Sequence, residues 1–353
     1  MNRQQSDIAD RGSWIVDRGP LHVHHPPSTI HHPHGGSILI YVLWVTFLLS
    51  LFAVSVASQA SAGLRFSDRM LGQLRMRGIA QAGLLKAIEA LALDASMVDT
   101  LSDPWADSFH DRTQWDGIFS LMSSPKPDPE RRYGLADEER RLNLNTAPKD
   151  ALDRLIRSVT PLAPDDADAL ADAISDWRDE DDDAEPHGAE HFYYRGLANA
   201  YDCKNGPFEQ LEELRLVKGV SPAIYRWLEP HVTVYGSGAV NVNTTSPVIF
   251  AALGLSPQGV AGLRAFRSGE DGLEGTGDDQ AFSSVDGMEA DLRAYLPQAD
   301  LGRLAQLMQK KLLTVSSRAF RFHLEASDGT PAHAVHAMGI IDREGHVKLW
   351  TER

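Results

Sequence analysis

The longest hydrophobic pattern in the chain lies near its N-terminus. Residues 37–64 contain no charged side chain, and residues 38–57 are almost entirely apolar. About 20 apolar residues in a helix cross the roughly 30 Å hydrocarbon layer of a membrane. We therefore interpret this segment as a membrane-spanning helix. A buried core helix would need a large domain around it, which the residues before the segment cannot supply. One alternative stays open, a secretory signal peptide cut near Ala60-Ser61-Ala62.

The helical period continues beyond this apolar segment. Apolar or small residues recur at steps of three and four, at Leu71, Leu74, Gly78, Ala82, Leu85, Ile88 and Ala92. Together the two segments predict one helix of about 55 residues, roughly 80 Å long. We expect its first half in lipid and its second half packed on a soluble domain.

The C-terminal end of the chain has the period of β-strands. Phe320, Phe322 and Leu324 alternate with polar residues, and residues 332–341 and 346–350 predict two further strands. The segment from residue 142 to about residue 300 instead predicts short helices and turns. The expected fold class is α+β, in which the long helix and a small antiparallel sheet share one core and the helical region is inserted.

One short pattern occurs twice within the helical region. Leu142-Asn-Leu-Asn-Thr146-Ala-Pro resembles Val240-Asn-Val-Asn-Thr244-Thr-Ser-Pro, and an apolar helical stretch follows each copy. Two copies predict two related helical modules. We expect each threonine to cap the following helix and each proline to occupy its first turn. With the glycine turn in residues 216–222, the pattern looks like helix-hairpin-helix sequence.

Charge argues against the DNA binding for which such hairpins are known. The chain has 34 Lys and Arg against 49 Asp and Glu, a net charge of −15. Residues 141–235 carry ten basic and nineteen acidic side chains, and residues 236–301 carry three and nine. The basic patch that binds nucleic acid is therefore missing. A membrane-anchored, competence-like DNA receptor is kept as the alternative function.

The densest charge predicts a cation site. Residues 176–190 hold eight carboxylates and one arginine. Alternate carboxylates can point into one loop, and a distal glutamate can complete an oxygen shell for Ca²⁺. The expected ligands are Asp179, Asp181, Asp183 and Glu190. We expect no Cys or His beside the ion, which favours Ca²⁺ over Zn²⁺; the alternative is a solvated acidic loop.

A second acidic, glycine-rich stretch follows at residues 269–279. Glycines let a chain turn tightly, so Glu270, Asp271, Asp278 and Asp279 are candidate ligands for a second Ca²⁺. An ordinary surface turn has the same composition. The single cysteine, Cys203, excludes an intrachain disulfide and a cluster of cysteine ligands.

No catalytic motif accompanies these acidic stretches. The sequence has no Gly-x-Ser-x-Gly elbow, no His-Glu-x-x-His pair and no phosphate-binding loop. A secreted metal-dependent hydrolase would need a nucleophile or base beside the metal, and the sequence offers no strong candidate. We therefore expect that the protein is not an enzyme.

In combination these motifs resemble the type II secretion system minor pseudopilin K family, also called general secretion pathway protein K. The resemblance covers about residues 35–350, and its specificity comes from the order and spacing of its motifs. They are Arg141-Leu-Asn-Leu-Asn-Thr-Ala, Ile174-Ser-Asp-Trp-Arg-Asp-Glu-Asp-Asp, Gly188-Ala-Glu190, Tyr193-Tyr194, Glu212-Glu-Leu-Arg-Leu-Val-Lys-Gly219 and His231-Val-Thr-Val-Tyr235.

The resemblance implies a pilin-like body with two inserted SAM-like, or helix-hairpin-helix-like, domains. The implied divisions are a leader (residues 1–36), a transmembrane part (37–64), the first part of the body (65–140), a first helical domain (141–236), a second (237–301) and the C-terminal part of the sheet (302–353). Prepilin peptidase would cut between Gly36 and Ser37. Tyr41 then occupies the fifth mature position, where most pseudopilins have glutamate and protein K does not. The His-rich leader departs from the family because Pro33 and His34 stand where a basic residue is usual.

The function implied by the family is structural. Protein K caps the tip of the pseudopilus together with minor pseudopilins I and J, and promotes pseudopilus assembly for protein export across the outer membrane. The implied partners also include other pseudopilins, prepilin peptidase and the inner-membrane secretion platform. The implied location is the inner membrane, with a single span and the soluble body in the periplasm.

Overall fold

A single long helix opens the described part of the chain. The computed structural model describes residues 36–124 and 132–352. Helix α1 (Gly36–Leu93) is 58 residues long, which confirms the long helix predicted from the sequence. Apart from Gly36, the proposed leader lies outside the described residues. The chain divides into two compact units, with the boundary between Leu64 and Arg65.

The described part of the first unit is the apolar start of α1. Every side chain described from residue 38 to residue 64 is exposed, so this segment is not the core helix of a folded domain. Among the described residues, α1 is the one helix whose length and composition would let it cross a membrane. Both observations agree with the membrane-spanning segment predicted from the sequence.

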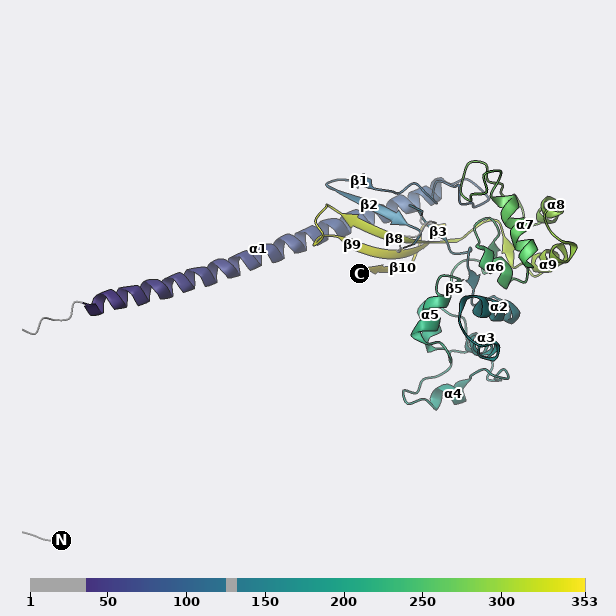
Figure 1. The fold of residues 1–353 in the computed structure, drawn as a ribbon, viewed down its shortest axis with the longest axis horizontal. Helices are drawn as coiled ribbons and strands as arrows, with labels where there is room; N and C mark the ends of the chain where they lie inside the picture. The colour runs from purple at the N-terminus through teal and green to yellow at the C-terminus, as the bar shows by residue number, and fades with distance from the viewer. Residues whose placement is uncertain (1–35, 125–131, 353) are drawn as a thin grey trace, which may run out of the picture. The chain divides into compact units, whose positions relative to one another are not determined.

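The second unit contains an antiparallel sheet of six strands, drawn beside the later part of α1 in Figure 1. The strand order is β1-β2-β8-β9-β10, and β3 also pairs with β8. The strands are β1 (Arg112–Gln114), β2 (Gly117–Met122), β3 (Ala136–Asp137), β8 (Ala319–Ser327), β9 (Val335–Asp342) and β10 (Val347–Glu352). The three C-terminal strands confirm the prediction. Strands β1 to β3 were not predicted, because β1 and β3 are very short and β2 is buried without a clear alternation.

Helix α1 packs on this sheet through a different face from the one we predicted. The buried or closely packed positions are Gly72, Met76, Ile79, Ala80, Gly83, Ala87 and Leu91. A Cβ atom at Gly83 would lie 2.9 Å from Leu324 and 3.0 Å from Phe119, so glycine permits the close approach of helix and sheet. Residues 71–92 thus contain two apolar stripes. The stripe with more small residues is the one that packs on the sheet, because small side chains let the helix and the sheet pack closely.

The residues between β3 and β8 form the helical region. Its helices are α2 (Lys149–Val159), α3 (Pro164–Arg178), α4 (His191–Arg195), the 3₁₀ helix η1 (Leu211–Leu216), α5 (Pro222–Leu228), α6 (Pro247–Ala252), α7 (Pro257–Arg267), α8 (Met288–Leu292) and α9 (Gln298–Gln309). Their buried side chains form one continuous core, which is distinct from the core between α1 and the sheet.

Two short parallel ladders divide the helical region in two. Strand β4 (Leu142–Asn143) pairs with β5 (Val232–Thr233), and β6 (Val240–Asn241) pairs with β7 (Leu313–Thr314). The first ladder joins the beginning and the end of the first helical region, which therefore ends near the boundary we predicted. The second helical region continues past residue 301, because α9 packs on α8 and β7 completes the ladder with β6. The C-terminal part of the large sheet accordingly begins after β7, later than we expected.

The repeated Asn-x-Asn motif makes the same hydrogen bonds in both regions. Asn145 Oδ1 accepts the Phe208 N–H at 2.7 Å, and Asn145 Nδ2 donates to the Phe208 carbonyl at 3.0 Å. Asn243 holds Phe282 in the same way, at 2.8 and 3.1 Å. Both phenylalanines are buried in the helical core. Each motif thus fixes a distant aromatic residue, which explains the repeat better than helix capping does.

The threonines of the repeat do not cap the helices that follow, so that prediction was wrong. Thr146 Oγ1 donates to the Gly238 carbonyl at 2.6 Å, and Thr244 Oγ1 donates to the buried Asp137 carboxylate at 2.5 Å. The residue at the N-cap of α2 is Pro148, while Pro247 occupies the first turn of α6 as expected. The threonines instead connect one part of the fold to another.

A buried ion cluster joins the sheet to the helical region. Glu138 is fully buried and pairs with Arg141 and with Arg321 on β8, where Arg321 Nε lies 2.7 Å from Glu138 Oε1. The hydroxyl of Thr233 on β5 donates to the same carboxylate. Burial alone would raise the pKa of Glu138, but the two arginines and the Thr233 hydroxyl together outweigh it and lower that pKa. Glu138 is therefore ionised and bound to both parts of the fold.

We expect Asn145→Ala and Asn243→Ala to destabilise the protein similarly, because each leaves a buried N–H and a buried carbonyl without partners. An unsatisfied buried group costs ~1–3 kcal/mol. Denaturant unfolding should show this loss for both variants, whereas Gln309→Ala on an exposed position of α9 should change little. A loss for only one variant would show that the two motifs do not have the same role.

Glu138→Ala should destabilise the protein more strongly. It leaves the charges of Arg141 and Arg321 buried without their partner, and breaking a buried ion pair costs ~3–5 kcal/mol. Thermal or urea unfolding measures the change, with Glu344→Ala at an exposed turn as the control. A change as small as that of the control would mean that the cluster does not hold the two parts together.

Candidate functional site

The acidic loop after α3 is fastened at its far end to that helix. Asp176 is fully buried, and its carboxylate accepts the N–H groups of Glu185 at 3.1 Å and Ala189 at 2.6 Å. Gly188 lies against this carboxylate so closely that a Cβ atom there would overlap it. Lys218 Nζ donates to the Gly188 carbonyl at 2.8 Å. Residues 185–190 are thus held rigidly, as a binding site requires.

In and beside the acidic loop, several side-chain oxygens have no hydrogen-bond donor. Asp179 Oδ1, both carboxylate oxygens of Glu190 and Asn205 Oδ1 are buried atoms without a hydrogen-bond partner. Glu190 as a whole is 6 % exposed. Buried polar atoms normally have partners, so a group of unpartnered acceptors points to a missing positive group. These oxygens are of the kind that bind Ca²⁺.

The raised pKa values of Glu190 and Asp179 reflect the same lack of a nearby positive charge. Burial raises the pKa of Glu190 to about 7, and the charges of Asp176, Asp179 and Asp182 add to the rise. Burial also raises the pKa of Asp179 to about 6, with further contributions from Asp181 and Asp176. Burial and mutual repulsion both disfavour the charged carboxylates, and a bound cation would offset both.

The four expected ligands of this loop have different environments in the structure. Asp179 and Glu190 belong to the group of unpartnered oxygens. Asp181 Oδ1 accepts the Asp183 N–H at 2.9 Å and so shapes the loop, while the Asp183 side chain is exposed. Asn205, whose Nδ2 donates to the Asp181 carbonyl at 2.6 Å, was not among the expected ligands. An asparagine before a glycine is typical of a turn, so its place in the sequence does not single it out as a ligand.

A cysteine and a histidine also lie at this site, contrary to our expectation. The Cys203 thiol neighbours the Glu190 carboxylate, and the Cys203 N–H donates to His191 Nδ1 at 3.0 Å. His191 Nε2 lies 3.7 Å from Asp182 Oδ1. Burial, with the adjacent Glu190, raises the pKa of the Cys203 thiol to about 12. The absence of Cys and His therefore no longer argues for Ca²⁺ over Zn²⁺.

The second acidic loop uses its carboxylates to hold its own backbone. Asp278 Oδ2 accepts the N–H groups of Glu270 at 2.8 Å and Asp271 at 3.1 Å, and Asp279 Oδ2 accepts that of Gly275 at 2.5 Å. In this loop, which is described throughout, no buried carboxylate oxygen lacks a partner. The observation that favours a cation at the first loop is thus not repeated here.

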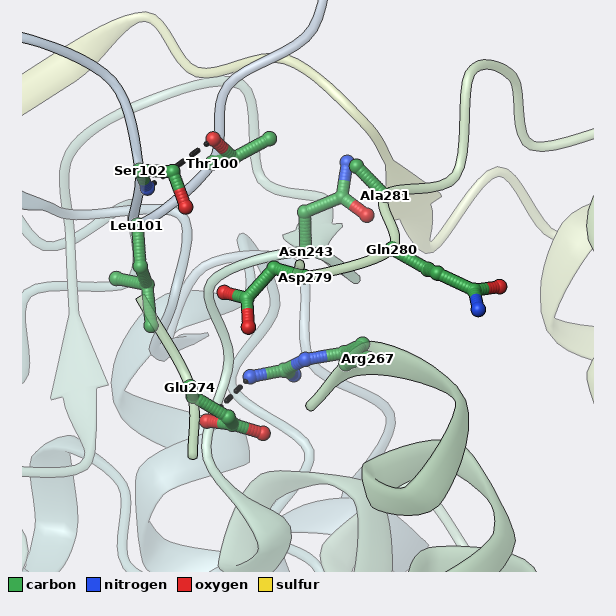
Figure 2. A pocket seen from close by; sticks show the side chains of 9 residues that line it. All are labelled: Thr100, Leu101, Ser102, Asn243, Arg267, Glu274, Asp279, Gln280 and Ala281. Atoms are coloured by element: carbon green, nitrogen blue, oxygen red, sulfur yellow. Dashed lines mark hydrogen bonds and ion pairs between the residues drawn. The ribbon is translucent and has the colours of Figure 1, made fainter. Parts of the chain in front are cut away.

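A small cavity of about 80 Å³ lies beside the second loop (Figure 2). The Arg267 side chain, which is 4 % exposed, enters it, and Arg267 Nη2 lies 2.8 Å from Glu274 Oε2. Asp279 lines the same cavity. A buried guanidinium already pairs with Glu274 in this cavity, so the cavity is poorly suited to a cation.

The glycine turn of the hairpin-like segment makes internal hydrogen bonds. The Lys218 N–H donates to the Tyr194 hydroxyl at 3.1 Å, and the Val220 N–H donates to the Val217 carbonyl at 3.1 Å. A DNA-binding hairpin would offer such N–H groups to a phosphate. Their internal use and the negative charge of both helical regions disfavour the DNA-receptor alternative.

Comparison with known proteins agrees with the resemblance seen in the sequence. Residues 134–237 match the family model described as Type II secretion system (T2SS), protein K. Type II secretion system protein K of Aeromonas hydrophila is 42 % identical over 81 residues, which are 22 % of this chain and 24 % of that protein. The Klebsiella pneumoniae protein is 27 % identical over 222 residues, 60 % and 67 % of the two chains. The Pseudomonas aeruginosa protein is 31 % identical over 158 residues, 44 % and 46 % of the two chains.

The matched segments thus span from about a quarter to two thirds of the length of these relatives. A solved structure shares the fold over a longer stretch. A chain of the GspK-GspI-GspJ complex from the enterotoxigenic Escherichia coli type 2 secretion system aligns with a TM-score of 0.62 and 20 % identity, covering 82 % of this chain and 98 % of that chain. These comparisons identify the chain as a relative of type II secretion system protein K, with the match to the family model at residues 134–237.

Proposed function

We propose that this protein is a minor pseudopilin that joins the tip of a type II secretion pseudopilus and promotes its assembly. The relatives named protein K and the shared fold with a chain of the GspK-GspI-GspJ complex support this role. By analogy its partners are pseudopilins of the I and J types. In this proposal the apolar start of α1 spans the inner membrane, and the second unit lies in the periplasm.

The outward stripe of α1, which contains Leu71, Leu74, Gly78 and Leu85, is the observation that supports the proposal most directly. Leu71, Leu74 and Leu85 are 56 %, 53 % and 65 % exposed, on the side of the helix away from the sheet. A helix that packs on its own domain normally exposes polar residues on its opposite side. A second apolar stripe with helical spacing suits packing against another helix.

Gly78 lies in the middle of the outward stripe. A Cβ atom built there meets nothing within 4 Å, so internal packing does not require glycine. Glycine inside a helix costs ~1 kcal/mol relative to alanine. A partner helix that approaches closely at Gly78 would explain why a residue unfavourable to this helix is present.

Two finer features belong to the same proposal. We infer that prepilin peptidase cuts between Gly36 and Ser37, at the start of α1, and that the inner-membrane secretion platform receives the processed protein. We also infer that the two helical regions are SAM-like modules. The matching roles of Asn145 and Asn243, and the parallel ladder that brackets each region, support a common origin for the two.

The full-length chain, purified in detergent, should form a complex with its partner pseudopilins I and J. Leu74→Gln combined with Leu85→Gln should weaken this complex at least tenfold, because both substitutions place a polar amide in the proposed helix interface. Light scattering and analytical ultracentrifugation measure the assembly. Leu216→Gln, at another exposed leucine, is the matched control and should leave the complex intact.

If wild-type chain and folded partners remain monomeric, the assignment as a tip subunit is wrong. If the complex forms but the double variant binds normally, the assignment stands and the outward stripe is not the interface.

We further propose that a structural Ca²⁺ binds at the first acidic loop, held by Asp179 and Glu190 with the side-chain oxygen of Asn205. The unpartnered buried oxygens of these three residues support this choice. The ion would remove the repulsion among the carboxylates and tie the loop to α4. A second Ca²⁺ at Glu270, Asp271, Asp278 and Asp279 remains a prediction from sequence alone.

Millimolar Ca²⁺ should raise the thermal midpoint relative to EGTA, by the equivalent of ~2.7 kcal/mol at a hundredfold excess over Kd. Without metal, stability should fall as the pH rises from about 4.5 to about 7, because in this range the folded state still holds a proton on Glu190 that the unfolded state has already lost. Ca²⁺ should remove this fall.

The matched variants distinguish the ligands. Asp179→Asn and Glu190→Gln should abolish the Ca²⁺ response, whereas Asp183→Asn should retain it, because the Asp183 side chain is exposed. An unchanged wild-type midpoint in Ca²⁺ would leave only a solvated acidic loop.

A further inference from the structure

We propose that His333 is a pH-sensitive latch that, when protonated, holds the hairpin between β8 and β9 against α1. Its ring lies between Asp328 of the hairpin and Asp68 of α1, close to the point where the helix enters the second unit. The inference depends neither on the proposed assembly nor on the proposed cation site.

The ring packs directly on the backbone of α1, at a position where the helix has a glycine. A Cβ atom at Gly72 would lie 2.3 Å from two atoms of the His333 ring, so a larger residue could not be accommodated without moving the ring. His333 is only 8 % exposed. Beside this contact, Gln73 Nε2 donates to the Ala332 carbonyl at 3.5 Å. The hairpin and the helix, far apart in the sequence, therefore meet at the histidine.

The turn of the hairpin positions the ring. Asp328 Oδ1 accepts the Thr330 N–H at 2.9 Å, and the His333 N–H donates to the Thr330 carbonyl at 2.9 Å. His333 Nδ1 lies 2.8 Å from Asp328 Oδ2. One carboxylate thus binds both the backbone of the turn and the ring, which leaves Nε2 on the side of α1.

Both ring nitrogens have a carboxylate as their neighbour, since His333 Nε2 lies 3.6 Å from Asp68 Oδ2. A neutral imidazole has one N–H group and one lone pair, so one nitrogen would direct its lone pair at a carboxylate. The imidazolium has an N–H group on each nitrogen and can attract both carboxylates at once. Loss of the proton therefore weakens the connection between the hairpin and α1, where the nitrogen-to-oxygen distance is already the longer one.

The charges around the ring favour the protonated form. The hydrogen bond to Asp328 raises the pKa of His333 against the opposing effect of burial, and the charges of Asp328 and Asp68 add to the rise. The same hydrogen bond lowers the pKa of Asp328. Within residues 36–124 and 132–352, no lysine or arginine forms an ion pair with either carboxylate, and Arg69, next to Asp68 on α1, is exposed. The protonated ring is thus the cation that these two carboxylates share.

The directions of these pKa shifts define the pH range in which the latch is closed. An unpaired histidine has a pKa of about 6.5. Because the pKa of His333 is raised in the folded state, its stabilising contribution is complete below about pH 6.5 and is lost as the pH rises through the raised value. At the acid end the contribution is lost only when Asp328, whose pKa is lowered, becomes protonated. Mild acidification should therefore fasten the beginning of the packed part of α1 to the sheet.

The first test measures the titration of the ring in the full-length chain in detergent. NMR of labelled histidine side chains gives the midpoint, and the His333 signal is the one that is absent from His333→Gln. We expect a midpoint above about 6.5 that falls in Asp328→Asn and in Asp68→Asn, because each variant removes a charge that favours the imidazolium. Asp116→Asn, at the exposed turn between β1 and β2, is the matched control and should leave the midpoint unchanged. A wild-type midpoint at or below 6.5, or one that neither Asn variant lowers, would overturn the proposal.

The second test asks whether the titration changes the contact with α1. Peptides covering residues 68–73 and 328–333 should exchange their amide hydrogens severalfold more slowly at about pH 6 than at about pH 8, after correction for the intrinsic exchange rates. His333→Gln should abolish this difference. Gly72→Ala should abolish it too, because the added Cβ displaces the ring, although alanine favours the helix itself. Both readouts are local, so the titration of Glu190 in the acidic loop does not contribute to them. Equal exchange at the two pH values in wild type, or a difference that persists in either variant, would show that His333 does not hold the hairpin against α1.

Discussion

The fold of the second unit depends on one buried carboxylate. Glu138 lies where the chain leaves the sheet for the helical region, and it binds Arg321 of β8, Arg141 before β4 and Thr233 of β5. The helical region is inserted into the sheet, so both of its connections must be held close together. Asp137 extends this junction to the second helical region through Asn241 and Thr244. A charge taken out of water is tolerated here because it has several partners at once.

The same rule, that a buried charge needs partners, explains why the first acidic loop differs from the rest of the molecule. Most buried carboxylates in the helical region are satisfied, as Asp176 is by two backbone N–H groups and Asp300 is by Ser256. Glu190 is equally buried and has no such donor. The surrounding loop is nevertheless anchored, so the chain cannot relax to expose this carboxylate to water. A site of this kind gains stability from a ligand, and structure and binding are thereby coupled.

Helix α1 shows how one element can meet two requirements. Small residues on its inner face let it approach the sheet closely. Its outer face exposes leucines around Gly78, where an added Cβ atom would meet no neighbour. Burial inside the chain accounts for the first stripe only. The second is explained by an assembly in which helices of several chains lie side by side, and this connects the packing of α1 to the proposed role at a pseudopilus tip.

The sequence by itself determined the features that depend on local periodicity. The long helix, the alternation of β8 to β10, the duplicated Asn-x-Asn motif and the acidic loop all follow from residues close together in the chain. The order of its motifs also indicated the family. Tertiary structure alone decided which stripe of α1 is buried, since both stripes have the same spacing and only the sheet distinguishes them. It also decided which oxygens of the acidic loop would be buried without a donor, at Asp179 and Glu190, while Asp183 stays exposed. Contacts of this kind depend on how the loops close, which hydrophobic periodicity does not specify.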